Sequence, residues 1–334
     1  MHNISPLWGD EERLNLEFVQ KIGELEGDDE NYMFYFPNDV DRDKYGNIYI
    51  LEAGNCRIQK FDTDGNYLAT IGNKGQGPGE FDNPYDLEID DSGNIFVYNQ
   101  PLKILKLNPE GKYFDTFPAS RFTTSFEVLK NGNLIFANMP IGIKDSIENL
   151  LTICDDQGKT IIDCCIQGIP IVNNPIGTFN LFFCDTDQND NIIVDFYHQN
   201  RIEKYNPFGK QIFKMDRKLG YEITHKETEY DFTYQGATIT LPTIRYSIIS
   251  VLAGIDHKNR IWEYFRKRQP ADGEKINDDN IDEYSEIRIY DNDGIFLTKI
   301  PNSSVKQGSL IIKNDRLYSI TKDMCVYEYR IVDK

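Results

Sequence analysis

Residues 83–97 read NPYDLEIDDSGNIFV and residues 36–50 read FPNDVDRDKYGNIYI, so one pattern occurs twice. In both, an alternating polar and apolar run is followed by a turn containing Gly-Asn and by a second apolar run. This order predicts a strand, a tight turn and a strand. A second hairpin follows each copy, at residues 57–68 and 103–114. One repeat therefore comprises four short strands.

The repeat continues along the chain in weaker form. Further copies of the first hairpin lie at 126–136, 183–194, 252–262 and 310–318. The last of the six repeats lacks a fourth strand, while residues 16–23 (LEFVQKIG) resemble the fourth strand of the first repeat (67–72, YLATIG). We therefore expect an all-β fold, a six-bladed β-propeller of four-stranded antiparallel blades, closed by an N-terminal strand that completes the last blade.

The repeat pattern also carries a family likeness. The order I-G-x-x-G-x-G-x-G-x-F-x-x-P-x-D, then D-x-x-G-N-I-Y-V and N-R-I-x-x-F-D-x-x-G, resembles NHL-repeat six-bladed propellers of bacteria, within the TolB-like and NHL-like superfamily. The first two repeats match strongly and the later four mainly at their turns. The resemblance implies a non-enzymatic recognition or scaffold protein, exported or lipid-anchored outside the cytoplasm.

The expected organisation is a lead segment at 1–14 and one propeller domain at 15–334. The expected blades are 37–72, 84–118, 124–168, 180–216, 248–301 and 308–332 plus 15–23. A cytoplasmic location is the alternative if Met1 is the true start, whereas a signal segment before it would agree with export.

The amino-acid composition limits the classes of partner that the protein is expected to have. The formal charge of −18 and the pI near 4.7 repel phosphate backbones, so nucleic acid is not expected as a partner. A hydrophobic content of 40% is ample for a large core, and no apolar run is long enough to span a membrane. The six cysteines lack C-x-x-C spacing, which favours buried thiols and leaves their disulfide status open.

Two motifs suggest ligands, but their context favours turns. The glycines of 72–84 lack the Lys and Ser or Thr offsets of a phosphate loop, and no helix follows them, so we interpret this stretch as a connection between blades. The Asp-rich runs at 62–66 and 185–191 resemble the start of calcium loops without a Glu at the twelfth position. Asp and Asn also close hairpin turns, which is the preferred interpretation.

Three insertions interrupt the repeat, at 139–149, 217–247 and 266–285, and all belong to connections that emerge on one face of a propeller. Such insertions often mark a binding face. We therefore expect a surface for a protein or a small ligand such as a glycan, with Tyr230, Tyr234, Arg266 and His198 as candidate residues. The alternatives are that 230–234 is only an extra hairpin and that His198 is a solvated turn residue.

Asp39 and Asp86 occupy equivalent positions near the start of inner strands, close to the expected channel mouth, where they could face a ligand. Their counterparts in later repeats align with Phe126, Phe183 and Leu252, so a ring of carboxylates around a metal ion is not expected. No cofactor is predicted, and a divalent cation at the channel mouth is the less favoured alternative.

Arg57 and Arg201 recur at the start of third strands. We interpret them as ties between blades, and a cationic rim for ligands is the alternative. The leading hypothesis is thus a binding protein. The alternatives are a lactonase-like hydrolase or a lyase at the channel mouth, with Asp39 and Asp86 as acid, base or metal ligands, and a subunit of a homo-oligomer or filament.

Overall fold

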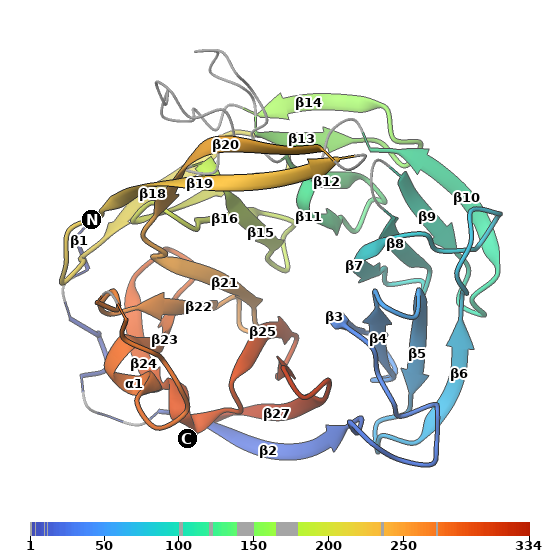
Figure 1. Cartoon of the computed structure of the whole chain (residues 1–334), viewed down its shortest axis with the longest axis horizontal. Helices are drawn as coiled ribbons and strands as arrows, with labels where there is room; N and C mark the ends of the chain where they lie inside the picture. Colours follow the sequence, from blue (N-terminus) through green and yellow to red (C-terminus); the bar gives the residue numbers. More distant parts are fainter. Residues whose placement is uncertain are drawn as a thin grey trace.

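The structure is a computed structural model. It describes residues 2–3, 5–9, 11, 13–99, 103–119, 123–138, 150–164, 180–234, 237–271 and 273–334, with the backbone alone over 2–3, 227–234 and 237–245. Six sheets surround a central axis in chain order, and the strands of each sheet succeed one another outward from that axis (Figure 1). The predicted six-bladed β-propeller is confirmed.

The strands of the first three blades follow the predicted order from inside to outside. Blade 1 contains β3 (Pro37–Arg42), β4 (Ile48–Glu52), β5 (Arg57–Phe61) and β6 (Tyr67–Ile71); blade 2 contains β7 (Pro84–Ile89), β8 (Ile95–Asn99), β9 (Lys103–Leu107) and β10 (Tyr113–Pro118); blade 3 contains β11 (Thr123–Val128), β12 (Leu134–Asn138), β13 (Leu151–Cys154) and β14 (Thr160–Cys164).

The last three blades repeat this arrangement. Blade 4 contains β15 (Phe182–Thr186), β16 (Ile192–Phe196), β17 (Arg201–Tyr205) and β18 (Gln211–Arg217); blade 5 contains β21 (Ser250–Ile255), β22 (Ile261–Arg266), β23 (Ser285–Tyr290) and β24 (Phe296–Pro301); blade 6 contains β25 (Gly308–Lys313), β26 (Arg316–Thr321), β27 (Val326–Asp333) and β2 (Leu14–Ile22). A short 3₁₀ helix, η2 (Asn302–Ser304), precedes blade 6.

Blade 6 closes the ring because its outer strand comes from the start of the chain. β2 pairs antiparallel with β27, with Leu14 opposite Asp333 and Ile22 opposite Val326, and the two strands lie side by side in Figure 1. The predicted closure by an N-terminal strand is therefore confirmed.

The lead segment also contacts the propeller. β1 (His2–Asn3) pairs in parallel with β18 and adds a fifth strand to the sheet of blade 4. Leu7 and Trp8 then donate backbone hydrogen bonds to Phe296 and Leu297 of blade 5, at 2.8 and 3.0 Å. The segment before β2 thus runs along the outside of two blades.

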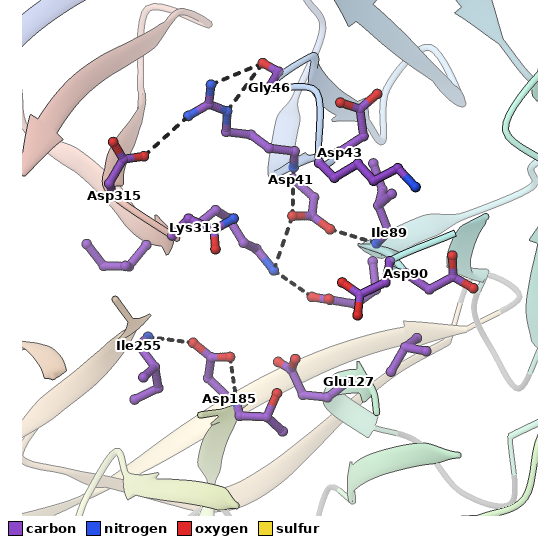
Figure 2. A pocket seen from close by; sticks show the side chains of 18 of the residues that line it. Asp41, Asp43, Gly46, Ile89, Asp90, Glu127, Asp185, Ile255, Lys313 and Asp315 are labelled. Carbon is purple, nitrogen blue, oxygen red and sulfur yellow. Dashed lines mark hydrogen bonds and ion pairs between the residues drawn. The ribbon is translucent and has the colours of Figure 1, made fainter. Parts of the chain in front are cut away.

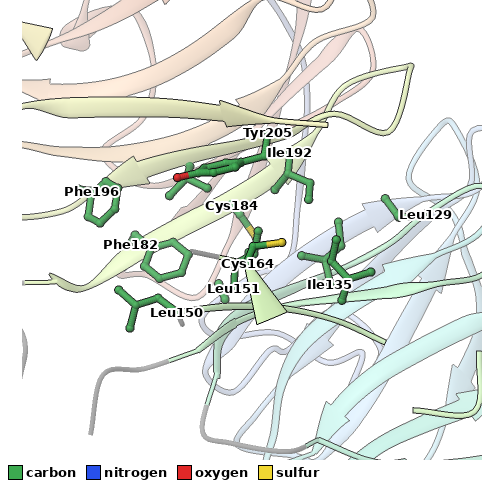
Figure 3. Close-up of a cluster of buried hydrophobic side chains, with 13 residues drawn as sticks. Leu129, Ile135, Leu150, Leu151, Cys164, Phe182, Cys184, Ile192, Phe196 and Tyr205 are labelled. Carbon is green, nitrogen blue, oxygen red and sulfur yellow. The ribbon is translucent and has the colours of Figure 1, made fainter. Parts of the chain in front are cut away.

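Apolar side chains from facing sheets fill the spaces between blades. In Figure 3, Ile135 and Leu151 of blade 3 pack with Phe182, Ile192 and Phe196 of blade 4, and all five are fully buried. Strands buried on both faces explain why the middle strands are almost continuously apolar. The core is therefore a series of layers between blades.

The hairpin turns use the Asp side chains that resemble calcium ligands. Asp62 Oδ1 accepts hydrogen bonds from the backbone N–H groups of Asp64 and Asn66, at 2.9 and 2.8 Å. Asp187 makes the same contacts with Asn189 and Asn191. Since these carboxylates bond their own turns, the structure agrees with the interpretation of both runs as hairpin turns.

The glycine-rich stretch between β6 and β7 is a blade-to-blade connection, as predicted. Gly72 has a φ of +76°, and a Cβ there would lie 2.4 Å from the Phe81 ring. The Gly77 N–H is bonded to the Glu80 carboxylate at 2.8 Å. The Gly77 amide therefore binds a carboxylate of the same chain, that of Glu80.

The second and third insertions contain additional structure. In chain order, β19 (His225–Tyr234) and β20 (Ala237–Tyr246) come between β18 and β21, and the two strands form a separate two-stranded sheet. The backbone at 230–234 is thus part of an extra hairpin, which was the alternative interpretation of this stretch. The third insertion joins β22 to β23 and contains α1 (Ile281–Tyr284), with Ile281 and Tyr284 buried. The first insertion, 139–149, lies outside the described residues.

Five cysteines are buried free thiols within the described residues: Cys56, Cys154, Cys164, Cys184 and Cys325. Cys165 lies outside the description. None of the described helices has the length and apolar character needed to cross a bilayer.

Candidate functional site in the central channel and on the insertion face

Two faces of the ring differ in their connections. The insertion face carries the connections β12–β13, β18–β21 and β22–β23, which contain the three insertions. The short-turn face carries the turns between first and second strands of each blade. The innermost strands β3, β7, β11, β15, β21 and β25 line the channel between these faces (Figure 1).

Near the insertion face, side chains of one inner strand bind the backbone of the next. The Leu87 N–H donates to Asp39 Oδ2 at 2.7 Å, and the Phe126 N–H donates to Asp86 Oδ2 at 2.9 Å. Ser125 Oγ accepts the N–H of Cys184 at 3.2 Å in the same manner. Asp39 and Asp86 therefore hold neighbouring blades together in addition to lining the channel.

The strand register corrects the alignment that placed Phe126 beside Asp86. Asp39, Asp86 and Ser125 pair with the fourth residue of the adjoining strand, namely Leu51, Tyr98 and Ala137. Ser125 is thus the counterpart of the two aspartates, and the earlier alignment was shifted by one residue in blade 3.

Two residues after the positions of Asp39, Asp86 and Ser125, four successive inner strands carry carboxylates. Asp41, Glu88, Glu127 and Asp185 each pair with the second residue of the adjoining strand. The alignment with Phe126, Phe183 and Leu252 did not reveal this row of carboxylates at a deeper level of the channel. The signal was the period-two spacing in Asp39-Val-Asp, Asp86-Leu-Glu and Ser125-Phe-Glu.

Blade 5 has Gly254 at the corresponding position, opposite Trp262. Its φ is +133°, and a Cβ would lie 2.9 Å from both Asp185 Oδ2 and the Ile312 Cβ. A side chain does not fit there, so the carboxylate series stops at blade 4.

Blade 6 supplies the cation of this cluster. Lys313 Nζ lies 2.7 Å from Glu88 Oε1 and 3.7 Å from Asp41 Oδ1 (Figure 2). Asp185 instead accepts backbone N–H groups from Thr186 and Ile255, both at 2.6 Å. Lys313 was not anticipated from the sequence, because its strand ends in a tighter turn and lacks the acidic pattern of the other blades.

The electrostatics of the cluster follow from burial and from its charge imbalance. Burial raises the pKa of Asp86 to about 6 and raises those of Asp39, Glu88 and Glu127 well above the ordinary range. Burial alone would lower the pKa of Lys313, but the surrounding carboxylates raise it well above its usual value. The channel therefore retains protons that the unfolded chain releases.

Two cavities adjoin the cluster from opposite sides. One of about 460 Å³ reaches the start of the inner strands and contains Asn38, Asp39, Tyr85 and Asp86. The other, of about 610 Å³, is bordered by short-turn residues such as Asp43 and Asp90. Glu88, Glu127, Asp185 and Lys313 line both. In the described part of the chain, no three His, Cys, Asp or Glu side chains are grouped to hold a metal ion.

The arginines of the third strands have structural contacts. Arg57 Nε lies 2.6 Å from Glu52 Oε1, and its Nη2 donates to the Glu30 and Met33 carbonyls of the connection from blade 6. Arg201 lies 3.3 Å from Glu203 Oε1 and stacks 3.8 Å from the Phe196 ring centroid, both within blade 4. Arg57 thus contacts the preceding connection, whereas these Arg201 contacts stay in one blade.

His198 and Arg266 lie on the insertion face. His198 is 8% exposed, and its Nδ1 lies 3.0 Å from the Ser247 carbonyl, so it is not a solvated turn residue. Arg266 Nε and Nη1 are buried without a hydrogen-bond partner. The side chains of Tyr230 and Tyr234 lie outside the described residues.

The fold and channel define a six-bladed β-propeller with an acidic cluster at its centre. Residues 24–202, more than half of the chain, match the model of the DUF5128 six-bladed β-propeller family. The chain belongs to this family. No curated protein sequence matches it.

Solved structures show the same fold at low identity. A DUF4221 family member from Bacteroides vulgatus is 13% identical, with a TM-score of 0.64 over 96% of this chain and 99% of that one. A provisionally named exported protein from Bacteroides fragilis is 11% identical, with a TM-score of 0.63 over all of both chains. A virginiamycin B lyase from Staphylococcus aureus is 11% identical, with a TM-score of 0.51 over 96% and 99%.

Proposed function

We propose that this protein is a non-enzymatic recognition propeller of the NHL type, and that its insertion face binds a partner through Arg266. The carrying observation is the half-buried Arg266, whose Nε and Nη1 atoms are buried and have no hydrogen-bond partner among the described residues. Buried N–H groups without a partner cost free energy, so retaining them suits a surface that an external anion completes.

The surroundings of Arg266 favour a carboxylate or phosphate group on the partner. Arg266 ends β22 where the third insertion begins, and its guanidinium carbon lies 5.5 Å from the Tyr264 ring centroid. Burial raises the pKa of Tyr197 and Tyr221, and Arg266 is one of the positive charges that oppose this rise. Aromatic rings beside a forked cation suit an acidic glycan or peptide.

The first test needs no ligand. Because the charge of Arg266 is unsatisfied, Arg266→Met should leave the free energy of unfolding unchanged or raise it by about 1 kcal/mol, measured by urea denaturation. The matched control is Arg268→Met, which removes an exposed pair with Glu274 at 2.9 Å and should change stability little. Marked destabilisation by Arg266→Met would show that the guanidinium has a structural role instead.

The second test measures recognition. Oligosaccharides containing glucuronic acid and Glu-rich peptides are compared with neutral analogues by titration calorimetry. Loss of a charge-assisted bidentate contact should weaken binding of the acidic probe about 10- to 100-fold in Arg266→Met and leave Arg268→Met unchanged. Equal binding of neutral and acidic probes, or equal affinities of the two variants, would contradict the proposal.

A channel hydrolase or lyase is the second candidate, favoured by one observation. Asp39 and Asp86 share a cavity, with the pKa of Asp86 raised to about 6 and that of Asp39 raised further by burial and by Asp86, an arrangement that could supply a base and an acid. Turnover of lactone or ester substrates that is lost in Asp86→Asn, together with a stoichiometric metal lost in Asp39→Ala, would favour this candidate.

We also propose an extracytoplasmic location. The support is the likeness to NHL propellers and the name of the neighbour from Bacteroides fragilis. Fractionation of cells that produce the tagged full-length protein tests this proposal, and recovery in the cytoplasm alone would refute it.

A further inference from the structure

The cavity on the short-turn face has an excess of acidic side chains. Its walls contain eight acids and three bases. The bases are Arg42, Lys44 and Lys313, and the acids are Asp41, Asp43, Glu88, Asp90, Asp91, Glu127, Asp185 and Asp315. Its volume of about 610 Å³ lies in the range of small-molecule sites. The walls are therefore predominantly acidic around a space large enough for an organic ligand.

Glu127 is a buried carboxyl group of this cluster that has no bonded partner among the described residues. It is 7% exposed and lines both cavities, yet no hydrogen bond or ion pair joins its carboxylate to another described residue. Lys313 is directed at Glu88 and Asp41 instead (Figure 2). A buried carboxylate facing a cavity without a partner is the complement of an incoming hydrogen-bond donor with positive charge.

We propose that this cavity binds an organic cation, with an ammonium group held between Glu127 and Asp185. Figure 2 shows both carboxylates directed into the same cavity, and their charges act on one another. An ammonium group has three N–H donors and can bond both carboxylates at once. This site is independent of the insertion-face function, because it opens on the opposite side of the ring.

The geometry favours an ammonium group over a metal ion. Within the described residues, no three His, Cys, Asp or Glu side chains are grouped closely enough for one ion. Both Asp185 oxygens already accept backbone hydrogen bonds, from Thr186 and Ile255, which fixes the orientation of the carboxylate. A divalent cation requires six or more short oxygen contacts, whereas an ammonium group needs two or three donor contacts at hydrogen-bond length.

The test uses putrescine and spermidine as probes and 1,4-butanediol as the neutral control, with titration calorimetry at pH 8 on the full chain. We expect the amines to bind and the diol not to bind. Glu127→Gln should weaken amine binding at least 10-fold, since it removes the carboxyl group that pairs with the ammonium ion and keeps the shape. The matched control is Glu110→Gln, an exposed Glu in the β9–β10 turn, which should bind like the parent protein.

Three results would overturn the proposal: no binding of either amine to the parent protein, equal affinities of the Glu127→Gln and parent proteins, or displacement of bound amine by micromolar Ca²⁺ or Mn²⁺. Because Gln is nearly isosteric and the site is buried, Glu127→Gln should remain folded. Circular dichroism and a denaturation curve confirm this before the titration.

Discussion

Arg217, the last residue of β18, is fully buried at the junction of blades 4 and 5, and its replacement gives a strong test of the fold. Its Nη1 lies 2.7 Å from Asp195 Oδ1 and also binds Glu263 Oε2. Its Nη2 donates to the Gln199 carbonyl at 2.6 Å. Asp195 and Glu263 are 1% and 0% exposed, so water cannot replace the guanidinium. Arg217→Met would therefore leave two buried carboxyl groups without their cation.

The magnitude follows from the two carboxylates that remain. Protonating an ordinary Glu side chain at pH 7 costs about 3.7 kcal/mol, and removing one partner of a buried ion pair typically costs about 3–5 kcal/mol. The pKa of Asp195 is already raised to about 7 by burial, so it contributes less. With an unfolding entropy of about 2.1 cal/mol/K per residue, a loss of 3–5 kcal/mol lowers the Tm by roughly 4–7 °C.

Urea denaturation at pH 7 measures this loss, with the fluorescence of the fully buried Trp262 as the reporter. The double variant Arg217→Met with Glu263→Gln should recover most of the stability, because it removes the unpaired charge. Arg13→Met is the control, since Arg13 forms an exposed pair with Glu11 and should lose less than about 0.5 kcal/mol. A loss below about 1 kcal/mol in Arg217→Met would refute the reasoning.

Two further predictions concern the channel and the second insertion. Because the pKa values of Asp39, Glu88 and Glu127 are raised, the folded chain holds more protons than the unfolded chain once the pH exceeds about 4, where unfolded carboxyl groups ionise. The free energy of unfolding should thus fall as pH rises, by up to about 1.4 kcal/mol per pH unit for each proton; urea curves test this, and stability that increases with pH would contradict it. The Ser247 N–H donates to the Thr224 carbonyl at 3.0 Å, so the ends of the β19–β20 hairpin adjoin. Replacement of residues 225–246 by Gly-Gly should leave a folded propeller with a Tm within a few degrees of the parent, and calorimetry showing loss of the unfolding transition would disprove this.

The architecture could be predicted because local chemistry repeats. Each turn with Asp or Asn followed by Gly fixes a hairpin, and the apolar strands between such turns require two facing sheets. The match between 16–23 and 67–72 located the closing strand. All these signals are short in range and survive divergence of the rest of the repeat.

The channel was harder to predict because it depends on register. In blade 3 a shift of one residue exchanged Ser125 with Phe126 and hid the carboxylate at Glu127, since neighbouring positions in a strand point to opposite sides. Lys313 joins the cluster only through ring closure, which brings blade 6 next to blade 1. The unpaired N–H groups of Arg266 and the burial of His198 likewise depend on tertiary contacts, which the spacing of residues in the sequence does not reveal.

The pairing of β2 with β27 has a consequence for how the molecule is made. β2 is synthesised before blades 1 to 5, and it has no partner in its own sheet until β27 has been synthesised. The early blades can form as they appear, but the toroid stays open, and the edge of β2 needs protection from other chains for the whole of translation.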